Sequence, residues 1–180
     1  MIINKNRFEM KKMLLSLLYI CVSVLGYSQS LSDLDRDPSF KGITIGAPIS
    51  KYSSFLRYQG TDKGKNAYLI TDSQYLSIFN IKMDKGVILE KNGKVDTIIL
   101  GKQSSSSTFN VNELNVLRSS LTFKYGAPNV SLDDFSSTPT VAGVRWQART
   151  VMIDAVYVFY GTSEPGSGLR YVLYQRNDDY

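Results

Sequence analysis

Short runs of alternating apolar and polar residues, separated by turn-forming residues, dominate the chain from residue 40 onward. Such alternation is typical of β-strands with one buried face. The dipeptide Asn92-Gly93 lies between two of these runs and predicts a type I′ hairpin, because both of its turn positions need a positive φ. The expected strands cover residues 40–46, 67–70, 75–83, 87–90, 94–100, 144–148, 151–160 and 169–175.

Two segments show the 3.6-residue apolar period of a helix instead. The first is a short helix that begins at Pro48, where proline loses no needed donor, and ends at Gly60. The second covers residues 111–125, and Asn110 with Glu113 resembles a capping box at its start. The pattern therefore predicts two helices among many short strands.

A run of serines within residues 102–108 is expected to be a flexible connector, without the length to separate domains. On each side of it a helix is followed by antiparallel strands. We therefore expect a single α+β domain over residues 40–180, with an antiparallel sheet packed against two helices. The repetition also allows two helix-plus-sheet halves.

The first 28 residues have the three parts of a secretory signal peptide: basic residues, an apolar run at 13–25 and a small-residue cleavage site. Gly26 and Ser28 predict cleavage after Ser28. The apolar run is about a dozen residues, too short for the roughly 20 of a membrane-spanning helix. We expect export to the periplasm or the medium, with an uncleaved anchor as the alternative. Residues 29–39 are polar and are expected to be a flexible lead-in.

Cys21 raises the possibility of a lipoprotein signal, together with Leu17 and Leu18. The residue before it is Ile20, where such a signal needs a small side chain, so the context argues against lipidation. Cys21 is also the only cysteine. After cleavage the protein could form no disulfide and would offer no thiolate.

Charge gives little indication of a partner. Four of the 21 basic residues and one of the 16 acidic residues lie in the predicted signal peptide, which leaves 17 basic and 15 acidic residues, a net charge of +2. These charges are interspersed, so nucleic acid is not an expected partner. No second long apolar run predicts a transmembrane segment.

Histidine is absent, which removes the commonest general base and the commonest metal ligand. Neither Ser-x-x-Lys nor Gly-x-Ser-x-Gly occurs after residue 28, so no serine nucleophile is indicated. We therefore expect no catalytic residue, no metal site and no cofactor.

Three carboxylates still need an explanation. Asp154 interrupts an apolar strand, and a buried carboxylate needs a hydrogen-bonded or charged partner. Arg145 or Arg170 could provide it, which favours a structural ion pair over catalysis. Asp133 and Asp134 follow a helix and precede a strand, and we interpret them as loop residues.

Aromatic residues are concentrated in the last three predicted strands. Trp146, Tyr171 and Tyr174 are the candidate binding residues, since a cross-strand aromatic cluster could hold a sugar or a peptide. The alternative is that these rings pack the sheet against the helices, where cross-strand aromatic pairs stabilise sheets.

The second half of the chain resembles a pattern found in small exported bacterial proteins of unknown function. Its residues are Leu117-x3-Leu121-x3-Tyr125-Gly-Ala-Pro, then Trp146, an apolar strand ending in Tyr160, and Leu169-x-Tyr171. The arrangement over roughly residues 40–175 also resembles the fold shared by the β-lactamase inhibitor protein and small outer-membrane assembly lipoproteins. That likeness implies an architecture only, because the inhibitor's disulfides are impossible here.

The leading hypothesis is a non-enzymatic exported module that binds a protein or an envelope component through its sheet. The alternative is a hydrolase or lyase of glycans that uses carboxylates alone, which would need two acids facing each other at about 5 to 10 Å. A third possibility is a small structural domain without a ligand.

Overall fold

A computed structural model describes residues 30–103, 111–161 and 166–176. The predicted signal peptide, its cleavage site, Cys21 and Asn110 lie outside these residues, as does most of the serine connector. Within the described residues the fold is mixed α+β and consists mostly of antiparallel sheet, which confirms the predicted class.

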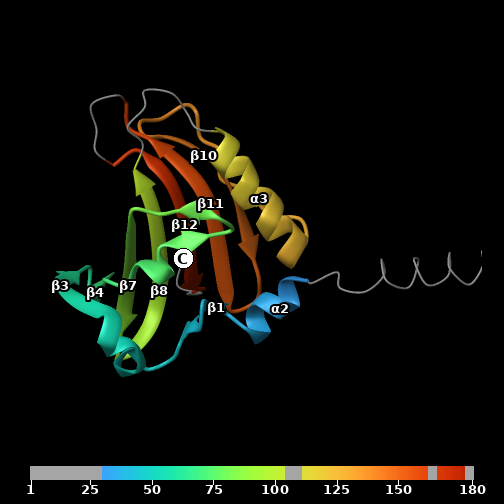
Figure 1. The fold of residues 1–180 in the computed structure, drawn as a ribbon. Helices are drawn as coiled ribbons and strands as arrows, with labels where there is room; N and C mark the ends of the chain where they lie inside the picture. The colour runs from blue at the N-terminus through green and yellow to red at the C-terminus, as the bar shows by residue number, and fades with distance from the viewer. Residues whose placement is uncertain (1–29, 104–110, 162–165, 177–180) are drawn as a thin grey trace, which may run out of the picture.

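Eight strands form one antiparallel sheet in the order β3-β4-β7-β8-β12-β11-β10-β9 (Figure 1). The pairing of β8 with β12 joins strands from the two halves of the chain, so both halves share this sheet. A duplicated helix-plus-sheet unit stays a prediction. The strands are β3 (Leu56–Asp62), β4 (Lys65–Ile70), β7 (Lys85–Lys91), β8 (Lys94–Gln103), β9 (Val130–Ser131), β10 (Thr140–Gln147), β11 (Val151–Phe159) and β12 (Gly168–Gln175).

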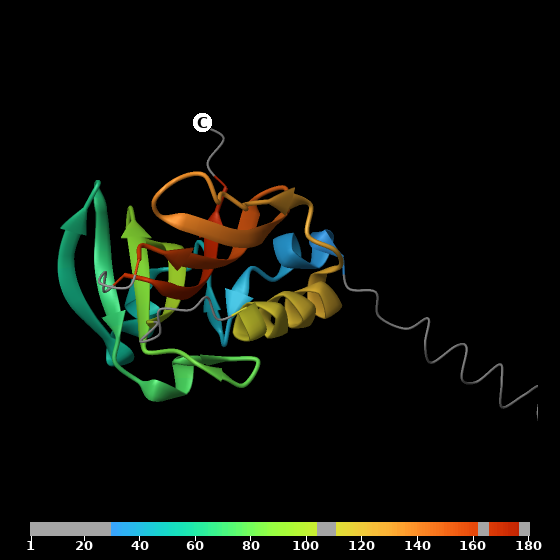
Figure 2. The ribbon, with the colours of Figure 1, turned by 90° about the horizontal axis from the view of Figure 1, so that it is seen from above.

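Two short ribbons stand apart from the large sheet: β1 (Ser39–Phe40) with β2 (Ile43–Thr44), and β5 (Ser77–Ile78) with β6 (Ile81–Lys82). The helix α3 (Val111–Tyr125) packs against β10 and β11 and contacts α2 (Leu31–Arg36). Figure 2 shows α2, α3 and the β5–β6 ribbon on one side of the sheet. Their apolar side chains join those of the sheet in one core.

The strongest sequence signals are confirmed. Asn92 and Gly93 have φ values of 55° and 79° and connect β7 to β8, as a type I′ hairpin requires. The helix predicted at residues 111–125 is present with the same bounds. Gly126 follows it with a φ of 81°, the left-handed conformation that commonly ends helices.

The predicted lead-in at residues 29–39 was wrong in its central part, because α2 forms there and Leu34 is fully buried. The carboxylate of Asp33 accepts a hydrogen bond from the backbone N–H of Ser30, which satisfies a donor at the helix start. A single buried leucine in a polar segment gives no periodic signal, so the sequence pattern missed this helix.

The predicted helix after Pro48 was wrong in type and in length. Ile49–Phe55 form a 3-10 helix, η1, and the chain then enters β3 at Leu56. Gly60 does not end a helix; it lies at a β-bulge in β3 with a φ of 125°. Glycine is common both at helix ends and at β-bulges, because both sites favour backbone conformations that other residues avoid.

The predicted strand at 75–83 is also divided. Its start belongs to a 3-10 turn, η2 (Ser73–Tyr75), and the rest forms the β5–β6 ribbon. The ribbon turns at Phe79 and Asn80, with φ values of 47° and 65°. Asparagine tolerates this conformation, but phenylalanine rarely adopts it, so the sequence shows no turn signal here.

Candidate functional site

The three candidate aromatic residues do not form a joint surface. Trp146 is fully buried, and its indole Nε1 donates a hydrogen bond to the carbonyl of Gly126 at 2.8 Å. This contact connects β10 to the end of α3. Trp146 therefore acts in the core, as the alternative interpretation predicted, and is not available to a ligand.

Tyr171 and Tyr174 lie on opposite faces of β12, because three positions separate them along a strand. Tyr171 shares the helix-covered face with Leu173 and Leu169, and all three are buried. Tyr174 lies half-buried on the other face, which α3 does not cover. The predicted aromatic platform is thus split between two environments.

Asp154 pairs with Arg145, one of its two predicted partners. Arg145 Nε donates to Asp154 Oδ1 at 2.7 Å, and the second bond, from a terminal guanidinium nitrogen to Oδ2, is 3.0 Å long. The hydroxyl of Tyr174 donates to the same Oδ2 at 3.1 Å. Burial raises the pKa of the Tyr174 hydroxyl, and the charge of Asp154 raises it further. Asp154 is thus held in a structural ion pair.

Asp133 and Asp134 are loop residues, as predicted. Asp133 accepts a hydrogen bond from the backbone N–H of Gly143 at 2.8 Å. Asp134 accepts bonds from the hydroxyls of Ser136 and Ser137, which lower its pKa. Both carboxylates therefore organise the connection between α3 and β10.

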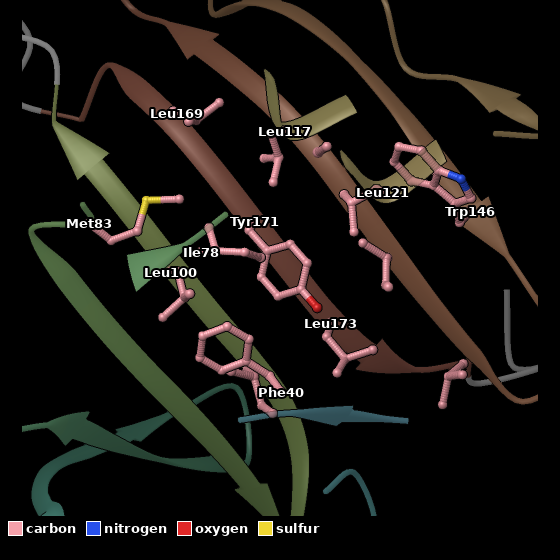
Figure 3. Packing of buried hydrophobic residues seen from close by; sticks show 14 of the residues in the cluster. Phe40, Ile78, Met83, Leu100, Leu117, Leu121, Trp146, Leu169, Tyr171 and Leu173 are labelled. Carbon is pink, nitrogen blue, oxygen red and sulfur yellow. The ribbon is translucent and has the colours of Figure 1, made fainter. Parts of the chain in front are cut away.

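A cavity of about 190 Å³ lies where α3, β1 and the β5–β6 ribbon meet over β12. We call it the tyrosine cavity. Figure 3 shows the ring of Tyr171 among Phe40, Ile78 and Leu121, and all four residues line the cavity. The ring centroids of Phe40 and Tyr171 are 5.8 Å apart. Its remaining lining residues are Ser39, Lys41, Ser77, Phe79, Lys124 and Tyr125.

Two tyrosines that line this cavity have hydroxyls for which the described residues provide no hydrogen-bond partner. Tyr171 and Tyr125 are only 3% and 4% exposed, yet neither hydroxyl forms a hydrogen bond within the described part of the chain. Burial raises the pKa of the Tyr171 hydroxyl, and the neighbouring Tyr125 raises it further. Tyr171 is therefore protonated at neutral pH and can donate a hydrogen bond.

Two lysines also line the tyrosine cavity. The Lys41 ammonium group donates to the backbone carbonyl of Gln74 and to the hydroxyl of Ser77. The Lys124 ammonium group lies 4.9 Å from the centroid of the Tyr125 ring, in a cation–π contact. No carboxylate is among the residues that line this cavity.

A second cavity, of about 310 Å³, lies at the ends of β8 and β12. It contains Lys102, Arg170 and Asp84, but each of these already has a partner. Lys102 pairs with Glu113, Arg170 donates to the carbonyl of Gly166, and Asp84 accepts from the backbone N–H of Gln103. The tyrosine cavity differs because the hydroxyls of Tyr171 and Tyr125, two of its lining residues, form no hydrogen bond within the described residues.

Neither cavity is lined by two carboxylates. Among residues 30–103, 111–161 and 166–176, no three potential ligand side chains gather closely enough to hold a metal ion. In the same residues, no helix is long and apolar enough to cross a membrane.

Comparison with known protein families, curated proteins and solved structures gives no match for this chain. The resemblances to small exported proteins and to the fold of the β-lactamase inhibitor protein therefore stay predictions. Function has to be argued from the cavity itself.

Sequence reasoning identified Tyr171 but missed the cavity around it. Its walls come from β1, β5, α3 and β12, which are far apart in the chain, and no sequence pattern links them. A weak signal existed in α3, because Tyr125 follows Leu117 and Leu121 at four-residue steps and therefore faces the core. A tyrosine at such a position needs a partner for its hydroxyl.

Proposed function

We propose that this chain is an exported, non-enzymatic binding protein whose ligand occupies the tyrosine cavity. One observation carries the proposal: two largely buried tyrosines line a common cavity, and their hydroxyls have no hydrogen-bond partner in the described residues. A few polar groups at fixed points in a mostly apolar cavity orient a small ligand there. A bound molecule could supply the missing partners of both hydroxyls.

The size and lining of the cavity support a ligand larger than water. An apolar cavity of about 150 Å³ is large enough to hold benzene, and this one measures about 190 Å³. Phe40, Ile78 and Leu121 supply apolar walls, while the tyrosines supply polar groups at defined points. Apolar walls with a few polar groups are the usual composition of small-molecule sites.

Tyrosine-to-phenylalanine variants test the proposal. Tyr171→Phe and Tyr125→Phe each remove a hydroxyl that has no hydrogen-bond partner among the described residues, so the ligand-free protein should be about as stable as the wild type in urea unfolding. Tyr52→Phe is the matched control. Its hydroxyl accepts from the backbone N–H of Thr44 at 3.0 Å and donates to the carbonyl of Gly42. Its removal should cost about 1 kcal/mol.

Ligand binding provides the second readout. Small aromatic molecules, charged and neutral, are screened against the full chain by ligand-observed NMR. We expect at least one to bind, to lose affinity in Tyr171→Phe or Tyr125→Phe, and to keep it in Tyr52→Phe. The proposal is wrong if no probe binds the wild type, or if the three variants bind equally well.

Export is a separate part of the proposal and is supported by the residue pattern of the first 28 residues. Expression of the full chain in a bacterial host, with mass spectrometry of each cell fraction, tests it. A periplasmic or secreted protein that begins at Gln29 is the expected result. Unprocessed chain confined to the cytoplasm would contradict it.

Two earlier hypotheses stay predictions. Binding of a protein or an envelope component through the sheet would use the face that carries Arg145, Asp154 and Tyr174. The glycan hydrolase or lyase would need a second acid opposite Asp154, whose own oxygens are bonded to Arg145 and Tyr174. The tyrosine cavity is favoured over both because it contains polar groups that still lack partners.

A further inference from the structure

We infer that the ligand of the tyrosine cavity is a small apolar monocarboxylate, with a body of about one aromatic ring and a carboxylate that lies near Lys41 and Lys124. This inference rests on the proposed function and specifies its ligand. Two lysines are among the residues that line one small cavity, and no carboxylate-bearing residue is among them. The missing negative charge is the observation that points to an acid.

Neither lysine has a counter-ion within the described residues. The partners of Lys41 are the carbonyl of Gln74, the hydroxyl of Ser77 and the ring of Phe40. All are uncharged, and one of the three ammonium N–H donors is left over. Lys41 is an exposed residue, and these neutral acceptors hold its ammonium group in one position.

Lys124 is half-buried and contacts the ring of Tyr125. Part of its role is structural, because a cation in the last turn of a helix interacts favourably with the helix dipole. This structural role explains Lys124 but not the presence of a second lysine, from another element, at the same cavity. Lys41 follows β1, far from α3 in the chain, and yet lines the same cavity.

The tyrosine hydroxyls complete the recognition of an acid. The Tyr171 hydroxyl is protonated at neutral pH and can donate a hydrogen bond to an acceptor. A carboxylate offers acceptor oxygens to the tyrosines and a negative charge to the lysines, whereas an amide offers one oxygen and no charge. An amine would repel both lysines.

Volume limits the body of the ligand. Benzene fits a cavity of about 150 Å³, so about 190 Å³ accommodates one ring with a short arm. Phenylacetate is therefore a suitable probe, and phenylacetamide is its neutral match with the same number of non-hydrogen atoms. 2-Phenylethylamine supplies the opposite charge on a similar body.

Isothermal titration of the full chain with these three probes tests the inference. We expect phenylacetate to bind with a dissociation constant on the order of 1 mM or lower, about tenfold more tightly than phenylacetamide, and the amine not to bind. Raising the salt concentration should weaken phenylacetate binding and leave the amide unchanged, because salt screens only the charged interaction.

Lysine variants connect the preference to this cavity. Lys41→Met and Lys124→Met keep most of the side chain's length but remove its charge. Each should weaken phenylacetate binding about threefold to tenfold without changing phenylacetamide binding. Lys82→Met is the control, because Lys82 is exposed on β6 and does not line the cavity. It should bind both probes like the wild type.

The outcomes separate the inference from the proposed function. Equal affinity for the acid and the amide, or a preference for the amine, would show that the ligand is not a monocarboxylate. The proposal that the cavity binds a ligand would still stand. If no probe binds, the inference and the proposed function are both contradicted.

A carboxylate can also belong to the last residue of a peptide, so N-acetylphenylalanine is tested as a fourth probe. Tighter binding of this compound than of phenylacetate would assign the acid to a chain end, and weaker binding to a free small acid.

Discussion

Asp35 and Thr150 are joined by two hydrogen bonds although 115 residues separate them in the chain. Asp35 Oδ1 accepts from the backbone N–H of Thr150 at 2.8 Å and from its hydroxyl at 2.7 Å. Oδ2 accepts from the backbone N–H of Arg149 at 2.9 Å. Arg149 and Thr150 form the turn between β10 and β11, so this carboxylate fixes α2 to the edge of the core.

The first prediction concerns pH. Burial alone would raise the pKa of Asp35, but the hydrogen bonds from Thr150 and Arg149 outweigh it, so the pKa falls below its ordinary value of 3.8. A carboxylate with a lowered pKa in the folded state stabilises the fold above its ordinary pKa, and this contribution is lost as the pH falls below it. Asp35→Asn should therefore be destabilised near pH 7, and the difference from wild type should shrink toward pH 3.

Urea unfolding of wild type and Asp35→Asn across this pH range measures the effect. Asp62→Asn is the control, because Asp62 is an exposed carboxylate in β3. It should follow the wild type at every pH. A difference for Asp35→Asn that does not change with pH would show that its charge has no part in attaching α2.

The second prediction concerns the start of the domain. Leu34 is fully buried in α2, so Leu34→Ala should lower the free energy of unfolding by about 2–4 kcal/mol. Leu31→Ala, in the same helix and only half-buried, should cost about 1 kcal/mol. Denaturant unfolding distinguishes them. If both variants unfold like the wild type, α2 does not contribute to the stability of the fold and residues 29–39 are a lead-in to the domain.

The third prediction concerns the ion pair on the open face of the sheet. Arg145 and Asp154 are bidentate and partly buried, with side-chain exposures of 26% and 14%. A double-mutant cycle with Arg145→Ala and Asp154→Ala should give a coupling energy of about 1–3 kcal/mol. Tyr174→Phe, which removes only the third hydrogen bond, should cost about 1 kcal/mol. Additive effects of the two alanine variants would mean that the pair does not stabilise the fold.

The fourth prediction concerns close packing of β10 against β11. A Cβ atom at Gly143 would lie 2.4 Å from Val156 Cγ1 and 2.7 Å from the carbonyl oxygen of Ala155. Backbone cannot move aside easily, so Gly143→Ala should destabilise the protein by about 1–3 kcal/mol. Gly101 in β8 has open space at the same place. Gly101→Ala should be close to neutral, and equal losses at both sites would contradict this explanation.

Local signals in the sequence were sufficient for much of the fold. The hairpin at Asn92-Gly93 and the helix at residues 111–125 depend on neighbouring residues, so they could be predicted. The partner of Asp154 could be narrowed to Arg145 or Arg170, because a buried carboxylate on a strand needs a cation on an adjacent strand. The register of β10 with β11 decides for Arg145.

Features that depend on distant contacts could not be predicted. α2 is stabilised by its contact with α3 and, through Asp35, by residues more than a hundred positions away. The turn at Phe79 has no turn-forming residue at its first position, so tertiary packing overrides local preference there. The tyrosine cavity is a similar case, because Tyr125 and Tyr171 meet only when α3 lies over β12.

An NMR titration of the full chain with phenylacetate tests the central claim most directly. The account predicts that amide chemical-shift changes cluster at the residues around the tyrosine cavity, including Phe40, Ile78 and Tyr171, and that they saturate at a single site. Changes that are absent, or that fall on the open face around Asp154 while these amides stay still, would contradict it.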